Sequence, residues 1–142
     1  MSKLTAQDVI FTLKMERHPE GGWHAQTFVD VGGESGRAQS TAIYYLLEAG
    51  DRSHWHKVDA VEVWHHYAGA ALELQLSDGV TIDPHVLGSD LAAGQRPQVV
   101  VPRDVWQAAK TLGDWTLVGC TVAPGFEFSG FELAPPDWQP GR

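Results

Sequence analysis

The residues of this chain that could do chemistry are concentrated in one short segment, where four of the seven histidines lie beside acidic and aromatic side chains. His54 and His56 are two residues apart, and residues two apart on a β-strand point to the same face. Glu62 follows a few positions later, and Trp64 and His66 repeat its parity. Two imidazoles and a carboxylate on one face can bind a divalent metal, and they can also transfer protons.

Charge and composition exclude several classes of partner. The chain has 142 residues, with 10 Lys and Arg against 18 Asp and Glu, a net charge of −8 and one cysteine. Nucleic acid and anionic membrane surfaces are poor partners for such a chain. We expect a single domain, 1–142, in the cytoplasm, because the sequence has no disulfide framework, no signal peptide and no apolar run of about 20 residues.

The start of the chain predicts a helix and a turn. Residues 2–14, within an N-terminal segment 1–16, have an apolar stripe at helical spacing, and Thr5 with Asp8 has the form of a capping pair. The sequence H-P-E-G-G at 18–22 ends this helix, because proline cannot continue it and two glycines permit a sharp turn.

From residue 23 to 133, short β-branched and aromatic runs predict strands, and residues 134–142 form an irregular tail. The predicted strands are 23–29, 40–48, 58–67, 71–76, 80–87, 97–101, 116–122 and 127–133, while 106–110 fits a strand or a loop. A single helical turn capped by Ser89 is expected at 89–93. One helix followed by many short strands predicts an all-β sandwich or barrel, and closing the sheet removes exposed edges.

Motifs spread over residues 13–138 form an ordered series. They are H-P-E-G-G at 18–22, His54-x-His56 with Glu62 and Gly69, G-Q-x-P-Q at 94–98, W-Q at 106–107 and L-V-G-C-T-V-A-P-G-F at 117–126. Together they resemble the DUF985, or cupin-5, family of the cupin superfamily. The resemblance implies a cupin-type jelly-roll β-barrel over 23–133, a homodimer, a pocket in the barrel mouth and a shape similar to sugar-nucleotide epimerases.

Against the family pattern, Gln107 stands where the second cupin motif usually supplies a His, and Val61 stands where an Asp usually precedes Glu62. The first interpretation is a divalent metal cofactor held by His54, His56 and Glu62, with Gln107 as a candidate fourth ligand. Such a site would support hydrolase or oxygenase chemistry. An amide oxygen is a poor ligand for these metals.

The second interpretation is proton transfer, as in an epimerase or isomerase. His56 would be the base, Glu62 would orient its ring or tune its pKa, and Tyr45 or Tyr67 would be the acid. This chemistry needs no metal.

The third interpretation is a pocket that binds a small polar molecule, such as a sugar or nucleotide sugar, without turnover. The residues expected to contact the ligand are His18, Glu20, Trp64, His66, Trp106 and Gln107. We expect Cys120 to be an inert core thiol, and the isolated His24 and His85 to be surface or hydrogen-bonded side chains.

Overall fold

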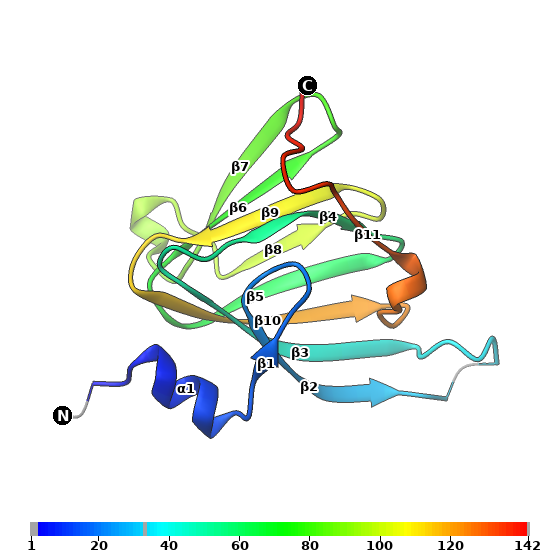
Figure 1. Ribbon diagram of the computed structural model, residues 1–142, viewed down its shortest axis with the longest axis horizontal. Coiled ribbons are helices and arrows are strands. Elements are labelled where there is room, and N and C mark those ends of the chain that lie inside the picture. Colours follow the sequence, from blue (N-terminus) through cyan, green and yellow to red (C-terminus); the bar gives the residue numbers. More distant parts are fainter. Residues whose placement is uncertain (1–2, 33, 142) are drawn as a thin grey trace.

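The computed structural model describes residues 3–32 and 34–141, which form two antiparallel sheets and one short α-helix (Figure 1). Residues 1, 2, 33 and 142, some of which the predicted helix and tail include, lie outside the described residues. The elements are α1 (Ala6–Thr12), β1 (Glu16–Arg17), β2 (Trp23–Asp30), β3 (Ser40–Glu48), β4 (Ser53–Val58), β5 (Val61–Gly69), β6 (Leu72–Ser77), β7 (Ile82–Leu87), η1 (Leu91–Ala93), β8 (Gln98–Val101), β9 (Trp106–Thr111), β10 (Trp115–Ala123), η2 (Phe128–Gly130) and β11 (Phe131–Leu133). The predicted all-β class is confirmed.

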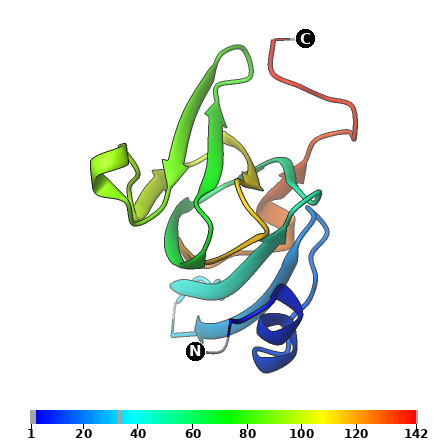
Figure 2. The same cartoon turned by 90° about the vertical axis from the view of Figure 1, so that its left-hand side faces the viewer.

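The larger sheet has the strand order β1-β2-β3-β10-β5-β8, and the smaller has β11-β4-β9-β6-β7. Figure 2 shows the two sheets curving around a shared interior. Large apolar side chains from both sheets fill part of that interior; they include Tyr45, Leu47, Trp64, Leu72, Leu74, Leu87, Val101 and Val118. The remainder contains polar side chains and forms the cavity described below.

The helix α1 lies outside the barrel, below the larger sheet in Figure 1. The predicted capping box is present, with the Asp8 amide donating to the Thr5 hydroxyl and the Thr5 amide donating to the Asp8 carboxylate. Val9 and Ile10 pack with Leu46 of β3. The helix ends before the predicted residue 14, because Lys14 takes a left-handed φ of 55° that turns the chain toward β1.

Three of the predicted elements differ from the structure. The strand predicted at 58–67 corresponds to β5, while Val58 is the last residue of β4, a separate strand that the predicted ranges did not include. Asp59 lies between the two strands and pairs with Arg37. The strand predicted at 127–133 starts with the 3₁₀ turn η2, and only its end, β11, pairs with β4. The helical turn η1 is capped by Asp90 rather than by Ser89. The segment 106–110, which the sequence left open, is strand β9.

The described part of the tail, after Leu133, has no helix or strand, as predicted. It is nevertheless ordered against the smaller sheet, because Trp138 packs on Trp106 with ring centroids 4.6 Å apart and on Trp55 at 6.1 Å. None of the helices among residues 3–32 and 34–141 has the length and apolar character needed to cross a bilayer.

The turn between β1 and β2 carries the H-P-E-G-G motif into the barrel, and Gly21 is essential to it. Its φ is +108°, a conformation that L side chains rarely adopt. A Cβ there would also overlap the Arg52 carbonyl oxygen. The Tyr45 hydroxyl donates a short hydrogen bond to the Gly21 carbonyl oxygen, which fixes the turn to β3.

We therefore expect Gly21→Ala to lower the free energy of unfolding by roughly 3–5 kcal/mol, from backbone strain and steric overlap together. The matched control is Gly50→Ala, since Gly50 also has a positive φ (+85°) but no heavy atom within 4 Å of the position that a Cβ would take. That control should lose only about 1 kcal/mol. Urea denaturation of both variants measures the difference, and equal losses would contradict the proposed overlap.

Candidate functional site

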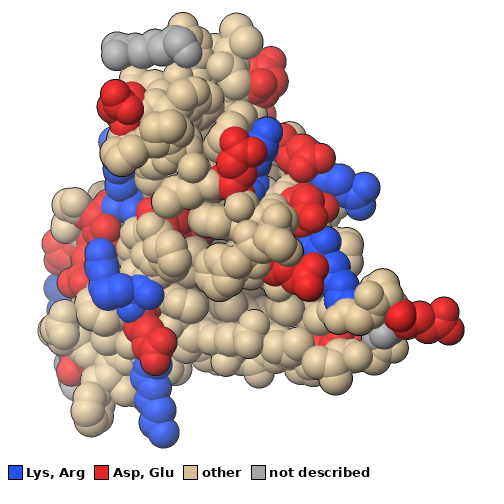
Figure 3. All heavy atoms as spheres, turned by 45° about the vertical axis from the view of Figure 1, so that its right-hand side comes forward, with Lys and Arg blue, Asp and Glu red and all other residues tan. Residues whose placement is uncertain are grey.

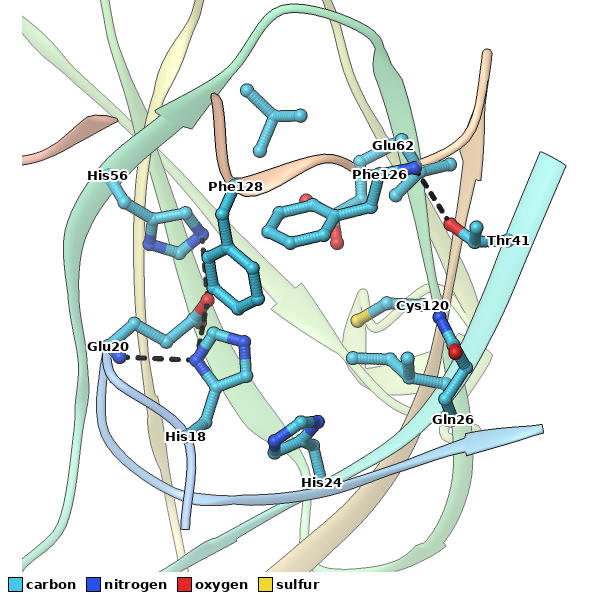
Figure 4. A pocket seen from close by; sticks show the side chains of 13 residues that line it. His18, Glu20, His24, Gln26, Thr41, His56, Glu62, Cys120, Phe126 and Phe128 are labelled. Carbon is cyan, nitrogen blue, oxygen red and sulfur yellow. Dashed lines mark hydrogen bonds and ion pairs between the residues drawn. The ribbon is translucent and has the colours of Figure 1, made fainter. Parts of the chain in front are cut away.

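A cavity of about 200 Å³ lies inside the barrel, between the two sheets (Figure 4). It contains two carboxyl groups, three imidazoles and two phenyl rings, and its other lining side chains are one amide, one hydroxyl, one thiol and three aliphatic groups. The lining residues are His18, Glu20, His24, Gln26, Thr41, Ile43, His56, Val58, Glu62, Cys120, Val122, Phe126 and Phe128. They come from the 18–22 turn, from β2, β3, β4, β5 and β10, and from the segment around η2.

Glu20 is the centre of the polar cluster. One of its carboxyl oxygens, Oε1, lies 3.4 Å from His18 Nδ1 and 3.4 Å from His56 Nε2. The other, Oε2, accepts a short hydrogen bond from the Ser53 hydroxyl. The turn and strand β4 are also joined through the backbone, because the His54 amide donates to the Glu20 carbonyl oxygen at 2.8 Å.

Hydrogen bonds to the backbone assign the proton on each imidazole. His18 Nδ1 accepts from the Glu20 amide at 3.1 Å, so this nitrogen carries no proton. His56 Nδ1 lies 2.7 Å from the His54 carbonyl oxygen, which can only accept, so this nitrogen is protonated. In the neutral ring, His56 Nε2 then directs a lone pair at Glu20 Oε1. At 3.4 Å this separation is longer than a normal hydrogen bond, so the lone pair lies beside the Glu20 carboxyl group without a strong bond to it.

Burial sets the pKa values of the cluster. It lowers the pKa of His18 and His56, although the neighbouring carboxyl groups partly oppose this effect. Burial also raises the pKa of Glu20, again against the effect of His18. All three shifts favour uncharged side chains near neutral pH.

Glu62 lies on the other side of the cavity from Glu20 (Figure 4). The Gln107 amide nitrogen donates to Glu62 Oε1 at 2.9 Å, and the Trp64 indole nitrogen donates to Gln107 Oε1 at 2.8 Å. The indole has only a donor to offer, so it fixes which end of the Gln107 amide faces Glu62. Burial raises the pKa of Glu62 to about 7, against the effect of His56.

A β-bulge in β4 separates the two histidines of the H-x-H motif. Ser53 pairs with Ala109 and His56 with Gln107, so β4 has one residue more than β9 between these pairs. His56 lines the cavity, whereas His54 lies along a separate hollow with Nε2 at 2.8 Å from the Pro135 carbonyl oxygen. The Ser53 side chain, which also borders that hollow, reaches the Glu20 carboxyl group. The expectation that His54 and His56 share a face is wrong because of this bulge.

The residues expected to hold a metal do not converge. His54 is outside the cavity, the Gln107 amide oxygen is bound by Trp64, and the Gln107 amide nitrogen faces Glu62. Only His56 and Glu62 of the four line the cavity. Among residues 3–32 and 34–141, no group of three or more His, Cys, Asp or Glu side chains is arranged to hold a metal ion. The geometry does not fit the expected metal set, and no chemical step below uses one.

Other expected site residues also lie outside the cavity. Tyr45 is fully buried with its hydroxyl bound to the Gly21 carbonyl oxygen, and burial raises its pKa well above the usual value. His66 Nε2 lies 3.1 Å from the Ala70 carbonyl oxygen. Trp106 packs against the tail, and Tyr67 is mostly exposed. Trp64 belongs to the apolar core and acts only through Gln107.

The sequence prediction missed several cavity residues, including His24, Gln26, Thr41, Phe126 and Phe128. The two-residue spacing of His24 and Gln26 on β2 is a signal that could have placed both on the cavity face. Cys120, expected to be a core thiol, also lines the cavity. Burial raises the pKa of this thiol well above its usual value, which keeps it protonated and a poor nucleophile.

Comparison with known proteins gives a consistent result. The family model described as Cupin superfamily (DUF985) matches residues 7–134. A protein from Shewanella oneidensis has a similar solved structure, with a TM-score of 0.89 and 37% identity over 93% of this chain and 85% of that one. The structure of a hypothetical protein from Leishmania major is also similar, with a TM-score of 0.83 and 27% sequence identity. The match covers 92% of this chain and 88% of that one. No curated protein matches the chain.

A more distant structural match is a variant of oxalate decarboxylase from Bacillus subtilis. Its TM-score is 0.62 at 9% identity, covering 82% of this chain and 29% of that one. At this identity the likeness shows the fold alone, which is the predicted cupin-type jelly-roll.

The raised pKa of Glu62 predicts a pH-dependent effect on stability. In the unfolded chain this carboxyl ionises near pH 4.5, and in the folded protein it ionises near 7. Between these values unfolding releases a proton, so stability falls as the pH rises. Glu62→Gln removes this pH dependence of stability and keeps a side-chain oxygen that can accept the hydrogen bond from the Gln107 amide nitrogen. As the pH rises from about 4.5 to 7, the free energy of unfolding of the variant should increase by on the order of 3 kcal/mol relative to that of the unchanged chain.

Urea denaturation at several pH values checks this expectation, with the exposed Glu132→Gln as the control for losing one carboxyl. A stability difference that does not change between pH 5 and 8 would contradict it.

Proposed function

The chain belongs to the DUF985 family of the cupin superfamily, and from this premise we propose that it binds a small polar ligand, sugar- or nucleotide-sugar-like, in the barrel and transfers a proton on it, as an epimerase or isomerase does. The observation that carries the proposal is the orientation of His56 at the wall of a cavity of ligand size: its Nδ1 is bound to the His54 carbonyl oxygen, and its Nε2 lies 3.4 Å from Glu20 Oε1. A general base needs a fixed geometry and an available lone pair, and the Nδ1 hydrogen bond of His56 supplies both at Nε2.

In the proposed mechanism, His56 is the base. Its ring is oriented by the hydrogen bond from Nδ1 to the His54 carbonyl oxygen, which leaves Nε2 to accept a proton from a ligand carbon beside a carbonyl group. Glu20 stabilises the imidazolium that forms, because its Oε1 lies 3.4 Å from Nε2. Ser53 holds the Glu20 carboxyl in place through Oε2.

Glu62 is the proposed acid. A carboxyl group with a pKa of about 7 is largely protonated just below neutral pH, so it can donate a hydrogen bond to the ligand carbonyl oxygen as negative charge develops there. Its position on the other side of the cavity from Glu20 supports this division of roles (Figure 4). Tyr45, the acid expected from the sequence, is engaged with Gly21 instead.

Two alternatives belong to this proposal. One is a metal-dependent oxygenase or hydrolase with a divalent cation, and the other is a ligand-binding module without turnover. We also propose a homodimer in the cytoplasm, as the family resemblance implies. Elemental mass spectrometry of protein purified without chelator, beside His56→Ala, tests the metal alternative. If the unchanged protein contains near-stoichiometric metal and His56→Ala does not, the metal-dependent alternative is favoured over the metal-free mechanism.

The expected result for His56 is a loss of proton exchange. The unchanged protein is incubated in D₂O with a panel of aldoses and nucleoside diphosphate hexoses. It should introduce deuterium beside a carbonyl group of its substrate, and mass spectrometry measures the rate of this exchange. His56→Ala should reduce that rate at least 100-fold, the usual contribution of a general base. His85→Ala, on the outer hairpin and paired with Asp83, is the control for loss of an imidazole.

Exchange that persists in His56→Ala would remove His56 from the base role. Binding of a panel member without any exchange in the unchanged protein would favour the non-catalytic module. Independently of any ligand, ¹⁵N NMR of the histidines should show His56 protonated at Nδ1, with an Nε2 signal that changes in Glu20→Gln.

A further inference from the structure

We propose that the ligand of this cavity is an uncharged hydroxy-carbonyl ring of monosaccharide size, without a phosphate or carboxylate group. The inference rests on the proposed function, because it names the ligand class on which Glu20 and His56 act. It narrows that function, since it excludes a nucleotide sugar with its diphosphate inside the barrel.

The lining of the cavity has no cationic side chain that could bind an anion. None of the thirteen lining residues is Lys or Arg, whereas two of them, Glu20 and Glu62, carry carboxyl groups. Proteins bind phosphate and carboxylate groups with Arg, with Lys or at helix N-termini. A buried anion without such a partner is strongly disfavoured, and the carboxyl groups would add repulsion.

The histidines of the lining do not supply the missing charge. Burial lowers the pKa of His18, His24 and His56, so all three are mainly neutral at pH 7. The helix α1 cannot supply it either, because it packs on the outer face of the larger sheet, against Leu46.

The arginine beside the rim of the cavity is already engaged. Arg37 donates from its two terminal nitrogens to the Asp59 carboxylate, at 3.1 and 2.8 Å, and from Nε to the Gly125 carbonyl oxygen at 2.7 Å. It also lies 3.4 Å from a Glu127 carboxylate oxygen. Arg37 therefore anchors the segment that leads to Phe126 and Phe128. On the face shown in Figure 3, basic and acidic side chains alternate, with no broad basic patch that could draw in an anion.

The size and polarity of the cavity also suit a single sugar ring. A space of about 200 Å³ accepts one six-membered ring with its substituents and leaves no room for a nucleotide beside it. Phe126 and Phe128 give one side of the cavity two aromatic rings, which suit the apolar face of a sugar (Figure 4). Glu62 and Gln26 offer hydrogen-bonding groups for hydroxyl and carbonyl oxygens. An ammonium group would need an ionised carboxylate, and burial favours the protonated acids instead.

The test compares matched sugars that differ in charge. Common hexoses are measured beside the corresponding amino sugars, uronic acids and hexose 6-phosphates at pH 6.5, by saturation-transfer NMR and thermal shift. At least one uncharged hexose should bind, and its charged counterparts should bind at least tenfold more weakly. Tighter binding of a uronate or phosphate would overturn the proposal, and tighter binding of an amino sugar would overturn it in favour of an ammonium ligand.

A charge-addition variant makes the same argument in the opposite direction. Gln26 is exposed at the edge of the cavity, so Gln26→Arg places a cation there. It should raise the ratio of uronate to hexose affinity at least tenfold. Gln98→Arg adds the same charge on β8, outside the cavity, and should leave that ratio unchanged. An unchanged ratio in Gln26→Arg would contradict the charge argument.

The failure of this inference is distinguishable from the failure of the proposed function. If no hexose binds, the ligand class is wrong, whatever the histidine spectra show. If ¹⁵N NMR shows His56 protonated at Nε2 instead of Nδ1, the proton-transfer function is wrong, whichever sugar binds.

Discussion

The contacts of the Glu20 carboxyl group with Ser53 and His56 connect the two parts of the barrel mouth. Glu20 enters on a turn that belongs to the larger sheet, and its partners stand on β4 of the smaller sheet. An ionisable group at this depth is tolerated only when hydrogen bonds compensate for lost water, and the Ser53 hydroxyl supplies one to Glu20. The tight turn at Gly21, the Tyr45 hydrogen bond and the register of β4 all serve to bring these groups into contact.

The barrel interior has an apolar part and a polar part. Apolar side chains fill one part, and the chain of hydrogen bonds from Trp64 through Gln107 to Glu62 marks where the polar cavity begins. Because this network satisfies the buried amide at both ends, the polar boundary does not weaken the core. The same burial that gives the barrel its stability also determines the pKa values on which the proposed chemistry depends.

Much of the fold followed from local sequence signals. The capping pair Thr5–Asp8, the β-branched and aromatic runs and the punctuation by Gly and Pro predicted elements that the structure confirms. The cavity was harder to predict, because pairing register is a property of two strands. Nothing in the spacing of His54 and His56 reveals that β4 bulges opposite β9. Likewise, Phe128 reaches the cavity on a segment that Arg37, far away in sequence, binds at the Gly125 carbonyl oxygen. The resemblance to family motifs indicated where in the barrel the cavity lies, but it did not reveal which side chains line the cavity.

The bulge in β4 has an evolutionary meaning. Which of two neighbouring histidines faces the interior depends on one extra residue in the strand, because a shift of one position exchanges its two faces. A single in-frame insertion or deletion of a codon between Ser53 and His56 could therefore change which imidazole the barrel contains, with the rest of the scaffold retained. Descent with such small length changes offers a simple route by which barrels that share one sequence motif come to perform different reactions.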